Sequence, residues 1–555
     1  MSDADSQPRA VASRRLALMR TPSPFAALLC TLLLLGCGSG GGSGSIGPSP
    51  ALPQTYRPTG KAAAGETFVH LFEWRWLDVA RECEVFLGPA GYAAVQISPP
   101  SEHALITNAT GSGVNFPWWQ RYQTVSYRLD NSRSGTLAEF QQMVTRCNAA
   151  GVRIYADAVI NHMTAGAGTG SAGSTYTKYN YPAVPYAPAD FHPACSINTY
   201  QSAFQVQNCE LDGLADLNTQ DDSVRTKIAN YLIALHTLGV AGFRIDAAKH
   251  IGPVDLDAII AKVNVAAQAA VPPRPLPYVF LEVINNAGEA VTAQQYFGVG
   301  YASGGASDIT EFNYGYQVSD AFLGRNGTNL AALQNLAASL LPSDKAVVFT
   351  DNHDNQRASN VYYASTFGGT PAYELAVIYT LAQPVGTVGV MSSYGFDHTT
   401  QAGLDSGPPG AGGTTASTFT DINAGTSACT VQLGTPQVGS WICEHRRNAI
   451  AQMIQFRRVV AAAPVSNWTL INGNQNQIAF ARTGSGFVAL NRDSIASSVT
   501  PLQTTLPDGM YCNIAVDTFT APSSCSGTPI AVTGGAALIT VPARGAVALH
   551  IGAKL

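Results

Sequence analysis

The sequence predicts an α/β protein built on a (β/α)8 TIM barrel, with a small domain inserted after strand 3 and a C-terminal antiparallel β-sandwich domain. Apolar runs alternate with helical patterns, which is typical of parallel strands joined by crossovers. Asp246 and Glu282 are 36 residues apart, and Glu282 and Asp354 are 72 apart. These spacings match one and two βα units of about 31 residues each. After residue 464 the pattern changes to short runs with turn signals, which predicts an antiparallel β-domain.

Six short runs predict buried parallel strands because both faces of each run are apolar. They are Phe68–Phe72, Ala93–Ile97, Val152–Val159, Ala241–Ile245, Tyr278–Ile284 and Ala346–Thr350.

Two helices stand out between these runs. Thr136 and Glu139 form a capping box, and Gly151 stands where a C-terminal cap belongs. A second helix that ends near Gly239 is indicated by an apolar stripe of Val224, Ile228, Leu232 and Leu235.

The third expected crossover is too long for one unit. From Asp157 to Asp246 there are 89 residues, and a Gly-, Tyr- and Pro-rich segment absorbs the excess as an inserted domain. We therefore expect a signal peptide at 1–36, a tether at 37–60, a barrel at 61–162 and 217–464, an insertion at 163–216 and a β-domain at 465–555.

Composition excludes several classes of protein. Among 555 residues, 31 Lys and Arg oppose 36 Asp and Glu, so no basic surface exists to hold nucleic acid. A hydrophobic fraction of 46% with 12% charged residues suits a loop-rich globular enzyme and excludes disorder, collagen and coiled coil. We expect a monomer.

The N-terminal region carries an export signal. Phe25–Gly36 is an apolar run of 12 residues preceded by arginines, too short to span a bilayer and typical of a signal peptide. The run ends at Cys37 in a sequence that resembles a bacterial lipobox, and Gly38–Pro53 is a flexible tether. We expect a cell-surface or outer-membrane lipoprotein tethered through a lipidated Cys37; the alternative is a secreted protein in which Cys37 is incidental.

Setting aside Cys30 inside the signal and Cys37 at its end leaves eight cysteines, an even number that suits an exported chain. Their order offers three local pairs that close short loops, and these leave Cys83 with Cys147. The local pairs are Cys195 with Cys209, Cys429 with Cys443, and Cys512 with Cys525.

Three acidic residues, Asp246, Glu282 and Asp354, interrupt otherwise apolar strands. A charged residue in such a run is costly to bury unless it is paired, so it is expected to have an ion-pair partner or a functional role. Strands of one barrel end at a common face, where two carboxyls can flank a glycosidic bond as acid and nucleophile. The alternative is that these are buried ion pairs or hydrogen-bonded strand ends.

The neighbours of these residues predict different roles. Arg244 stands two residues before Asp246, on the same side of the strand, where its charge would keep Asp246 ionised as a nucleophile. Glu282 has apolar neighbours that would raise its pKa and suit a general acid.

A further polar cluster, Asp157, Asn161 and His162, ends another strand. Asn161 and Asp216, with backbone carbonyls, could form a Ca²⁺ site where the insertion meets the barrel. His162 and His353 each adjoin a carboxylate candidate and could bond sugar hydroxyls. Equally, Asn161 could be a turn residue and the histidines satisfied core groups.

The segment Pro117–Gln123 offers flat side chains between strands. Trp118, Trp119, Arg121 and Tyr122 could form platforms for the apolar faces of sugars. Core packing is the ordinary alternative for a tryptophan.

Taken together, these strings resemble the α-amylases, specifically their animal-type branch. The resemblance covers residues 66–555 and is carried by VHLFEWRWLDVARECE, VQISPPSEH, PWWQRYQTVSY, RIYADAVINHM, GFRIDAAKH, FTDNHDNQR, WICEHRR and NWTLINGNQNQIAFAR. It implies the fold given above and retaining endo-hydrolysis of α-1,4-glucosidic bonds in starch and glycogen to maltooligosaccharides. It also implies the four disulfides suggested by cysteine order.

The resemblance assigns roles to residues. Asp246 matches the nucleophile, Glu282 the acid/base and Asp354 the transition-state stabiliser. Calcium ligands map to the side chains of Asn161 and Asp216 and to the carbonyls of Gln207 and His250. The expected substrate-binding residues are Trp118, Trp119, Tyr122, Gln123, Asp157, His162, Arg244, Lys249, His250 and His353.

The chain also departs from that pattern. Many animal-type enzymes bind an activating chloride with two arginines and an asparagine; Arg244 and Asn352 are present, but Gly395 stands where the second arginine is expected. We therefore expect weak or absent chloride dependence. The usual glycine-rich loop is replaced by Ala358–Thr370, and Asp130 and Thr164 occupy positions where vertebrate members have another disulfide.

Three functions remain open at this point. The complete carboxylate set favours an α-amylase. A non-hydrolysing starch-binding lipoprotein would be supported by loss of a catalytic carboxyl, and none is lost. A maltooligosaccharide-forming or transglycosylating relative depends on subsite shape, which motifs do not define.

Overall fold

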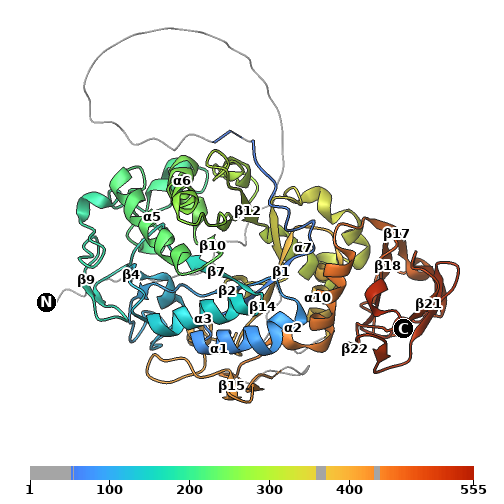
Figure 1. Ribbon diagram of the computed structural model, residues 1–555. Helices are drawn as coiled ribbons and strands as arrows, with labels where there is room; N and C mark the ends of the chain where they lie inside the picture. The colour runs from blue at the N-terminus through green and yellow to red at the C-terminus, as the bar shows by residue number, and fades with distance from the viewer. Residues whose placement is uncertain (1–51, 54, 358–370, 431–437) are drawn as a thin grey trace, which may run out of the picture.

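Eight parallel strands close into a barrel in the order β1-β14-β13-β12-β11-β10-β7-β2 (Figure 1). The structure is a computed structural model that describes residues 52–53, 55–357, 371–430 and 438–555. The barrel strands are β1 (Thr67–Leu71), β2 (Ala94–Ile97), β7 (Arg153–Ala158), β10 (Gly242–Ile245), β11 (Tyr278–Leu281), β12 (Ser307–Thr310), β13 (Ala346–Phe349) and β14 (Thr387–Ser392).

All six expected strands are present, and two further strands were missed. The β12 sequence SDIT is mostly polar, and β14, TVGVMS, is broken by Gly389, so neither forms a clear apolar run. A second difference concerns the acidic residues: β10 and β11 end one residue before Asp246 and Glu282. The carboxylates therefore follow the strands instead of interrupting them.

Helices surround the barrel strands (Figure 1). The α3 capping box is present, because Thr136 N–H donates to Glu139 Oε2 at 2.8 Å while Thr136 Oγ1 accepts from Glu139 N–H at 3.4 Å. The helices of the barrel region are α1 (Trp76–Glu82), a π-helical turn (Cys83–Leu87), α2 (Gly88–Ala90), α3 (Leu137–Ala149), α5 (Asp222–Thr237), α6 (Pro253–Ala269), α7 (Phe312–Leu323), α8 (Pro371–Ala382), α9 (Gln401–Asp405) and α10 (Asn448–Val460).

The long crossover between β7 and β10 folds over the barrel and is tied to the loop after β2. Ala104 bridges to Gly170, and the buried Glu102 accepts hydrogen bonds from the amides of Ala172 and Ser174 at 3.1 and 2.9 Å. The small elements here are β3 (Glu102–His103), β4 (Thr124–Ser126), β5 (Asn131–Ser132), β6 (Gly135–Thr136), β8 (Gly168–Thr169), β9 (Thr175–Tyr176) and α4 (Ala203–Asn208).

The C-terminal domain has two layers. Its main layer is an antiparallel sheet of β17 (Val465–Leu470), β18 (Gln477–Arg482), β19 (Gly486–Asn491) and β26 (Gly545–His550). The second layer contains the pairs β20 (Thr500–Gln503) with β25 (Ala536–Ile539), β21 (Gly509–Tyr511) with β24 (Ile530–Val532), and β22 (Phe519–Thr520) with β23 (Ser524–Cys525). The pair β15 (Phe419–Asp421) and β16 (Thr426–Ser427) precedes this domain.

Strands β18, β19 and β26 of the main sheet are buried on both faces. Ala479 and Phe487 face the second layer, whereas Phe480 and Val488 join the core of the barrel. Buried Arg482 fixes the junction, because its guanidinium donates to the carbonyls of Ala382, Ala461 and Ala463 at 2.6 to 2.7 Å. Figure 1 accordingly places α10 between the barrel and this domain.

The segment before β1 packs against the barrel. Thr59 Oγ1 donates to buried Asp308 at 3.0 Å, and Lys345 Nζ donates to the carbonyl of Arg57 at 3.1 Å. The part of the expected tether (37–60) that follows residue 54 is therefore docked, not free. The expected signal peptide, Cys37 and the segment Ala358–Thr370 lie outside the described residues. Across the described part of the chain, no helix is long and apolar enough to cross a membrane.

Four disulfides confirm the expected pairing of the mature cysteines. They are Cys83–Cys147, Cys195–Cys209, Cys429–Cys443 and Cys512–Cys525.

Candidate active site

Three carboxylates meet at the carboxyl ends of the barrel strands. Asp246 and Glu282 each follow a strand directly, and their strands β10 and β11 are hydrogen-bonded neighbours with Ile245 opposite Leu281. Asp354 lies in the loop after β13. Parallel strands present their carboxyl ends to one face, so residues far apart in sequence share one site.

Arg244 organises this site. Its Nη1 lies 2.8 Å from Asp246 Oδ1 and 2.7 Å from Asp157 Oδ1, while its Nη2 lies 2.6 Å from Glu282 Oε1. The sequence paired Arg244 with Asp246 alone; the structure divides its charge among three carboxylates. A guanidinium group can do this because it presents donors in a planar fork.

The electrostatics of the two candidate catalytic carboxylates follow from burial. Burial raises the pKa of Asp246, and Arg244 opposes that rise through its charge and hydrogen bond. Burial likewise raises the pKa of Glu282, opposed by Arg244 and reinforced by the negative charge of Asp246. Arg244 favours the ionised form of Asp246, as the sequence suggested, although burial still raises the pKa of this carboxyl. The raised pKa of Glu282 has the expected direction and cause.

Asp157 forms the floor of the cluster. Its side chain is fully buried, accepts a hydrogen bond from Tyr122 Oη at 3.0 Å, and pairs with Arg244. Burial raises its pKa to about 7 despite that pair. Asp157 therefore contacts Arg244 and Tyr122 through a side chain with no exposed surface.

Asp354 is the most open of the three, with a side chain that is 44% exposed. Its Oδ2 lies 3.2 Å from His353 Nε2, and the His353 ring stacks on Tyr122 with ring centres 5.0 Å apart. Trp118 meets the edge of His353 at 5.6 Å. Burial, followed by the charge of Arg244, holds the pKa of His353 well below its usual range, so this ring is neutral at neutral pH.

Arg357 was missed by the sequence analysis although it belongs to the quoted FTDNHDNQR string. Its guanidinium lies over the rings of Trp118 and Phe396 at 4.5 and 4.3 Å and donates to the carbonyls of His353 and Leu404. Trp118 Nε1 donates to the same Leu404 carbonyl at 3.0 Å. Arg357 therefore packs against Trp118 and binds the backbone of His353, so it helps to fix both residues.

The other expected contact residues lie around this cluster. Gln123 Oε1 accepts from the amide of Ala165 at 3.2 Å, which ties it to the insertion, and Trp119 is half-buried. His162 Nε2 donates to the Tyr122 carbonyl at 3.0 Å.

Lys249 has a partner that the sequence analysis missed. Its Nζ donates to the Ile284 carbonyl at 2.6 Å and pairs with Glu289, an acidic residue in the loop after β11. Lys249 Nζ also lies 5.2 Å from the centre of the Tyr200 ring. An acidic residue seven positions after Glu282 was the signal that could have revealed this pair.

The expected calcium ligands come from the insertion and from the loops after β7 and β10. Asp216 and His162 form a backbone bridge, and the side chain of Asn161 hydrogen-bonds to Asp216. His250 Nδ1 donates to the Val206 carbonyl at 2.8 Å, which places His250 beside Gln207 in the last turn of α4.

His192 also enters this group and was not anticipated. Its Nδ1 lies 2.7 Å from Asp216 Oδ2, and both side chains are buried. Burial raises the pKa of Asp216 to about 7, the state of a carboxylate that lacks a full counter-charge. One carboxylate, one amide and two carbonyl oxygens form a hard donor set that fits Ca²⁺.

Beneath the carboxylates lies a cavity of about 30 Å³, lined in part by Arg244, Asn352, His70 and Gln96. Asn352 Oδ1 accepts from the amides of Asp354 and Asn355 at 3.1 and 2.8 Å. Gly395, where a second arginine was expected, supplies no charge to this region.

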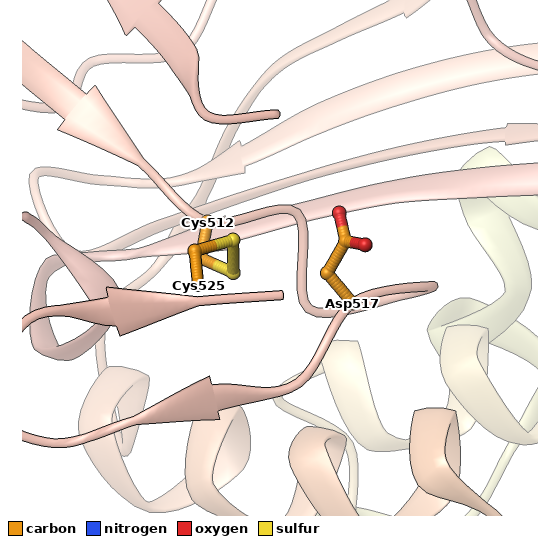
Figure 2. A group of neighbouring side chains, drawn as sticks. All are labelled: Cys512, Asp517 and Cys525. Carbon is orange, nitrogen blue, oxygen red and sulfur yellow. A yellow bond between two sulfur atoms is a disulfide. The ribbon is translucent and has the colours of Figure 1, made fainter. Parts of the chain in front are cut away.

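A separate group in the C-terminal domain superficially resembles a metal site. Cys512, Asp517 and Cys525 are neighbours (Figure 2), and their potential ligand atoms lie within 4.8 Å of one another. The two sulfur atoms are joined in a disulfide, and metals bind thiolates. This group therefore does not offer a metal site.

The chain matches two family models. Residues 115–380 match the alpha amylase catalytic domain, and residues 468–552 match the alpha amylase C-terminal all-beta domain.

Relatives match over most of the chain. The α-amylase of Tribolium castaneum is 44% identical over 506 residues, covering 89% of this chain and 96% of the relative. Pancreatic α-amylase 2a5 of Mus musculus is 43% identical over 80% of this chain and 86% of the relative, and α-amylase of Thermomonospora curvata is 43% identical over 95% and 79%.

A solved structure agrees. Wild-type α-amylase I of Eisenia fetida superposes with a TM-score of 0.76 at 36% identity, covering 91% of this chain and all of that one. A variant of the same enzyme was solved in complex with maltohexaose. The chain belongs to the α-amylase family of glycoside hydrolases.

Proposed function

We propose that this enzyme cuts α-1,4-glucosidic bonds within starch and glycogen, with retention of configuration, and releases maltooligosaccharides. The observation that carries the proposal is the Arg244 cluster, in which a single guanidinium binds Asp246 and Glu282 at 2.8 and 2.6 Å. Two carboxylates that bind one guanidinium are close neighbours. A retaining mechanism needs such closeness, because in retaining glycosidases the two carboxyl groups are generally about 5–5.5 Å apart.

Glu282 acts first as the acid. Its raised pKa keeps a proton available, which passes to the glycosidic oxygen as the bond from that oxygen to the anomeric carbon breaks. An oxygen of the Asp246 carboxylate forms the new bond to the anomeric carbon. Water then attacks this carbon, Glu282 takes the water proton, and the bond to Asp246 breaks.

Arg244 and Asp354 support this chemistry in different ways. Arg244 opposes the rise in the Asp246 pKa that burial causes, and this favours the ionised carboxylate that nucleophilic attack needs. Asp354 has a side chain that is 44% exposed, so its carboxylate can orient sugar hydroxyls and stabilise positive charge in the transition state.

The surrounding groups suit a neutral sugar chain. Trp118 and Tyr122 supply flat apolar rings, which pack against the neutral ring of His353. Lys249 lies in the loop after β10 and forms an ion pair with Glu289 in the loop after β11. This mix of platforms and polar groups is typical of carbohydrate sites.

The test uses soluble starch. Iodine-colour loss that runs far ahead of reducing-end release would establish internal cleavage, and proton NMR of the first products would establish retention through the α-anomer. Retention of starch without any hydrolysis would favour the non-hydrolysing binding protein. A single dominant product from the start would favour the maltooligosaccharide-forming or transglycosylating alternative.

Calcium binding is part of the proposal. α-Amylases generally bind calcium, and here Asn161, Asp216, Gln207 and His250 would hold it. Bound Ca²⁺ supplies a counter-charge that fixes the insertion against the loops after β7 and β10.

Removing calcium should therefore destabilise the enzyme. Chelation leaves buried Asp216 with only neutral hydrogen-bond donors and His192. We therefore expect the melting temperature to fall by at least about 5 °C, which for about 500 folded residues corresponds to about 5 kcal/mol. Scanning calorimetry with chelator and with restored Ca²⁺ checks this. Asp216→Asn is the matched variant, and its melting temperature should not respond to Ca²⁺.

Chloride should have little effect. Gly395 brings no cation to the cavity beneath the carboxylates, and Arg244 is already paired with three carboxylates. We expect kcat to change less than about two-fold between chloride and nitrate or sulfate salts at matched ionic strength. A rise of ten-fold or more in chloride alone would contradict this expectation.

We also propose that the enzyme works outside the cytoplasm. Four disulfides support an oxidising compartment, and the N-terminal sequence supports anchoring by a lipid on Cys37. Mass spectrometry of the N-terminal peptide of the exported protein tests the anchor, since Cys37→Ser would abolish it.

A further inference from the structure

A second cavity lies in the C-terminal domain, on the side of the main sheet that faces away from the barrel. Its volume is about 300 Å³, and it opens between β17 and β20, the strands at the edges of the two layers. This volume is at the small end of ligand pockets, which suits one or two sugar rings.

The rim of this cavity is polar but uncharged. Asn467, Thr469, Asn472, Thr500 and Gln503 line it, and no lining residue carries a formal charge. Amides and hydroxyls without charges match a neutral polyol and give no reason for an ionic ligand to bind. The floor is apolar, formed by Ile471, Ala479, Phe487 and Leu502.

The backbone of β17 is shaped to make this opening. The β17–β18 register shifts between Ser466 and Thr469, and Asn467 takes a left-handed conformation with φ of 53°. The ring of Trp468 stacks on Phe480, which belongs to the barrel-side core. Asn467 instead reaches across to β20, where its amide donates to the Gln503 carbonyl at 3.4 Å.

Two hydrogen bonds between β17 and β20 or their flanking residues mark the ends of the opening. Asn467 and Gln503 meet at one end, and Asn472 Nδ2 donates to Thr500 Oγ1 at 3.0 Å at the other. The side chains of Asn467, Asn472 and Gln503 are nevertheless exposed. The side-chain amides of Asn467 and Asn472 are therefore held by hydrogen bonds to β20 while they remain accessible to a ligand.

An apolar strip continues from the rim over the outer layer. Pro501, which lines the cavity, pairs across β20–β25 with Leu538, whose exposed fraction is 71%. Val499, two residues before Pro501, is 66% exposed. A polar rim next to an apolar strip matches the two kinds of surface on a glucan chain, its hydroxyls and its C–H faces.

We propose that this cavity is a second carbohydrate site, one that takes the end of an α-glucan chain and holds the enzyme on its polymeric substrate. The proposal rests on the proposed function for the choice of glucan. The concave shape and uncharged rim favour a sugar over a protein partner, which would need a broader surface.

Hydrogen–deuterium exchange tests this proposal with maltotriose as the probe. The protein is the exported full chain carrying Glu282→Gln, so the sugar is not consumed. We expect slower exchange at residues 465–472 and 500–503 in addition to the barrel site. The double change Asn467→Gly with Gln503→Ala should raise the maltotriose concentration needed for this protection at least about ten-fold.

The variants are chosen to keep the fold. Glycine tolerates the left-handed conformation of Asn467. Asn326→Gly is the matched control, because Asn326 has a φ of 54° and lies in a turn on the barrel. Protection at the barrel site within the same sample reports that each variant is folded.

The outcomes separate the two proposals. Protection at the barrel site but not at 465–472 and 500–503 would overturn the second site and leave the proposed function intact. Protection at neither place would count against the proposed function itself. Equal protection in the double variant and the Asn326→Gly control would also overturn the assigned rim residues.

Discussion

Replacing Glu282 by Gln should lower kcat on soluble starch by about 10²–10⁴-fold, the usual contribution of a general acid–base residue. Glutamine keeps the size and can still accept from the amide of Ala247, which donates to Glu282 Oε2 at 2.8 Å. It cannot give a proton to the glycosidic oxygen or take one from water. Steady-state rates of reducing-end release measure the loss.

The pH profile gives this prediction a second, independent measurement. Activity needs Asp246 ionised and Glu282 protonated. The acid limb of the kcat/KM profile therefore reports ionisation of Asp246, and the basic limb reports loss of the proton from Glu282. Both limbs give apparent pKa values of a coupled pair. Burial raises the pKa of Glu282, which moves the basic limb to higher pH. The Glu282→Gln variant should lose that limb.

Glu289→Gln is the matched control for Glu282→Gln, since it makes the same chemical change in the same loop. Glu289 pairs with Lys249 and not with Arg244. We expect this control to alter KM more than kcat. A Glu282→Gln enzyme with nearly full kcat and an unchanged basic limb would exclude Glu282 as the acid.

Replacing Arg244 by Gln should lower the free energy of unfolding by about 3–5 kcal/mol, the usual cost of breaking a buried ion pair. Asp157 is fully buried and would keep only the Tyr122 hydroxyl as a partner. Asp246 and Glu282 would lose a cation at 2.8 and 2.6 Å. Denaturant unfolding at neutral pH measures the change.

The same variant should change the pH dependence of stability and activity. Arg244 lowers the pKa of Asp157, Asp246 and Glu282 against the effect of burial. Without it these pKa values rise further above their unfolded values. Protons then bind more tightly to the folded state, so stability falls as pH rises from the unfolded carboxylate pKa toward the folded ones. The acid limb of activity should move to higher pH.

Arg244→Lys separates charge from geometry. Lysine retains a positive charge but lacks the planar fork that reaches three carboxylates. We expect it to recover part of the stability and little of the activity. Equal stability of the Arg244→Gln variant and the parent would contradict the view that Arg244 stabilises the buried carboxylates.

Much of the fold followed from local sequence patterns. The apolar runs located six barrel strands because strands covered on both faces must be apolar throughout. The Thr136–Glu139 capping box located α3, since this pattern satisfies backbone groups within one turn of the chain. The 72 residues between Glu282 and Asp354 correspond to two βα units, so the spacing left room for β12 although no apolar run revealed it.

Other features were decided by contacts between distant segments. The strands β12 and β14 lack a continuous apolar signal and are strands because their neighbours in the closed barrel supply hydrogen-bond partners. The segment around Thr59 is docked because Asp308, 249 positions later, needs a donor. Neither requirement can be read from a window of local sequence.

The candidate site divides in the same way. The sequence by itself determined which residues carry charge, that Asp246, Glu282 and Asp354 belong with strands of one barrel, and that Glu282 has apolar neighbours. Only the tertiary structure decided that Arg244 serves Asp157, Asp246 and Glu282 together and that His192 meets Asp216. The physical reason is that a pKa depends on every charge and on the loss of water within a few ångströms, and the chain brings those groups together only when it folds.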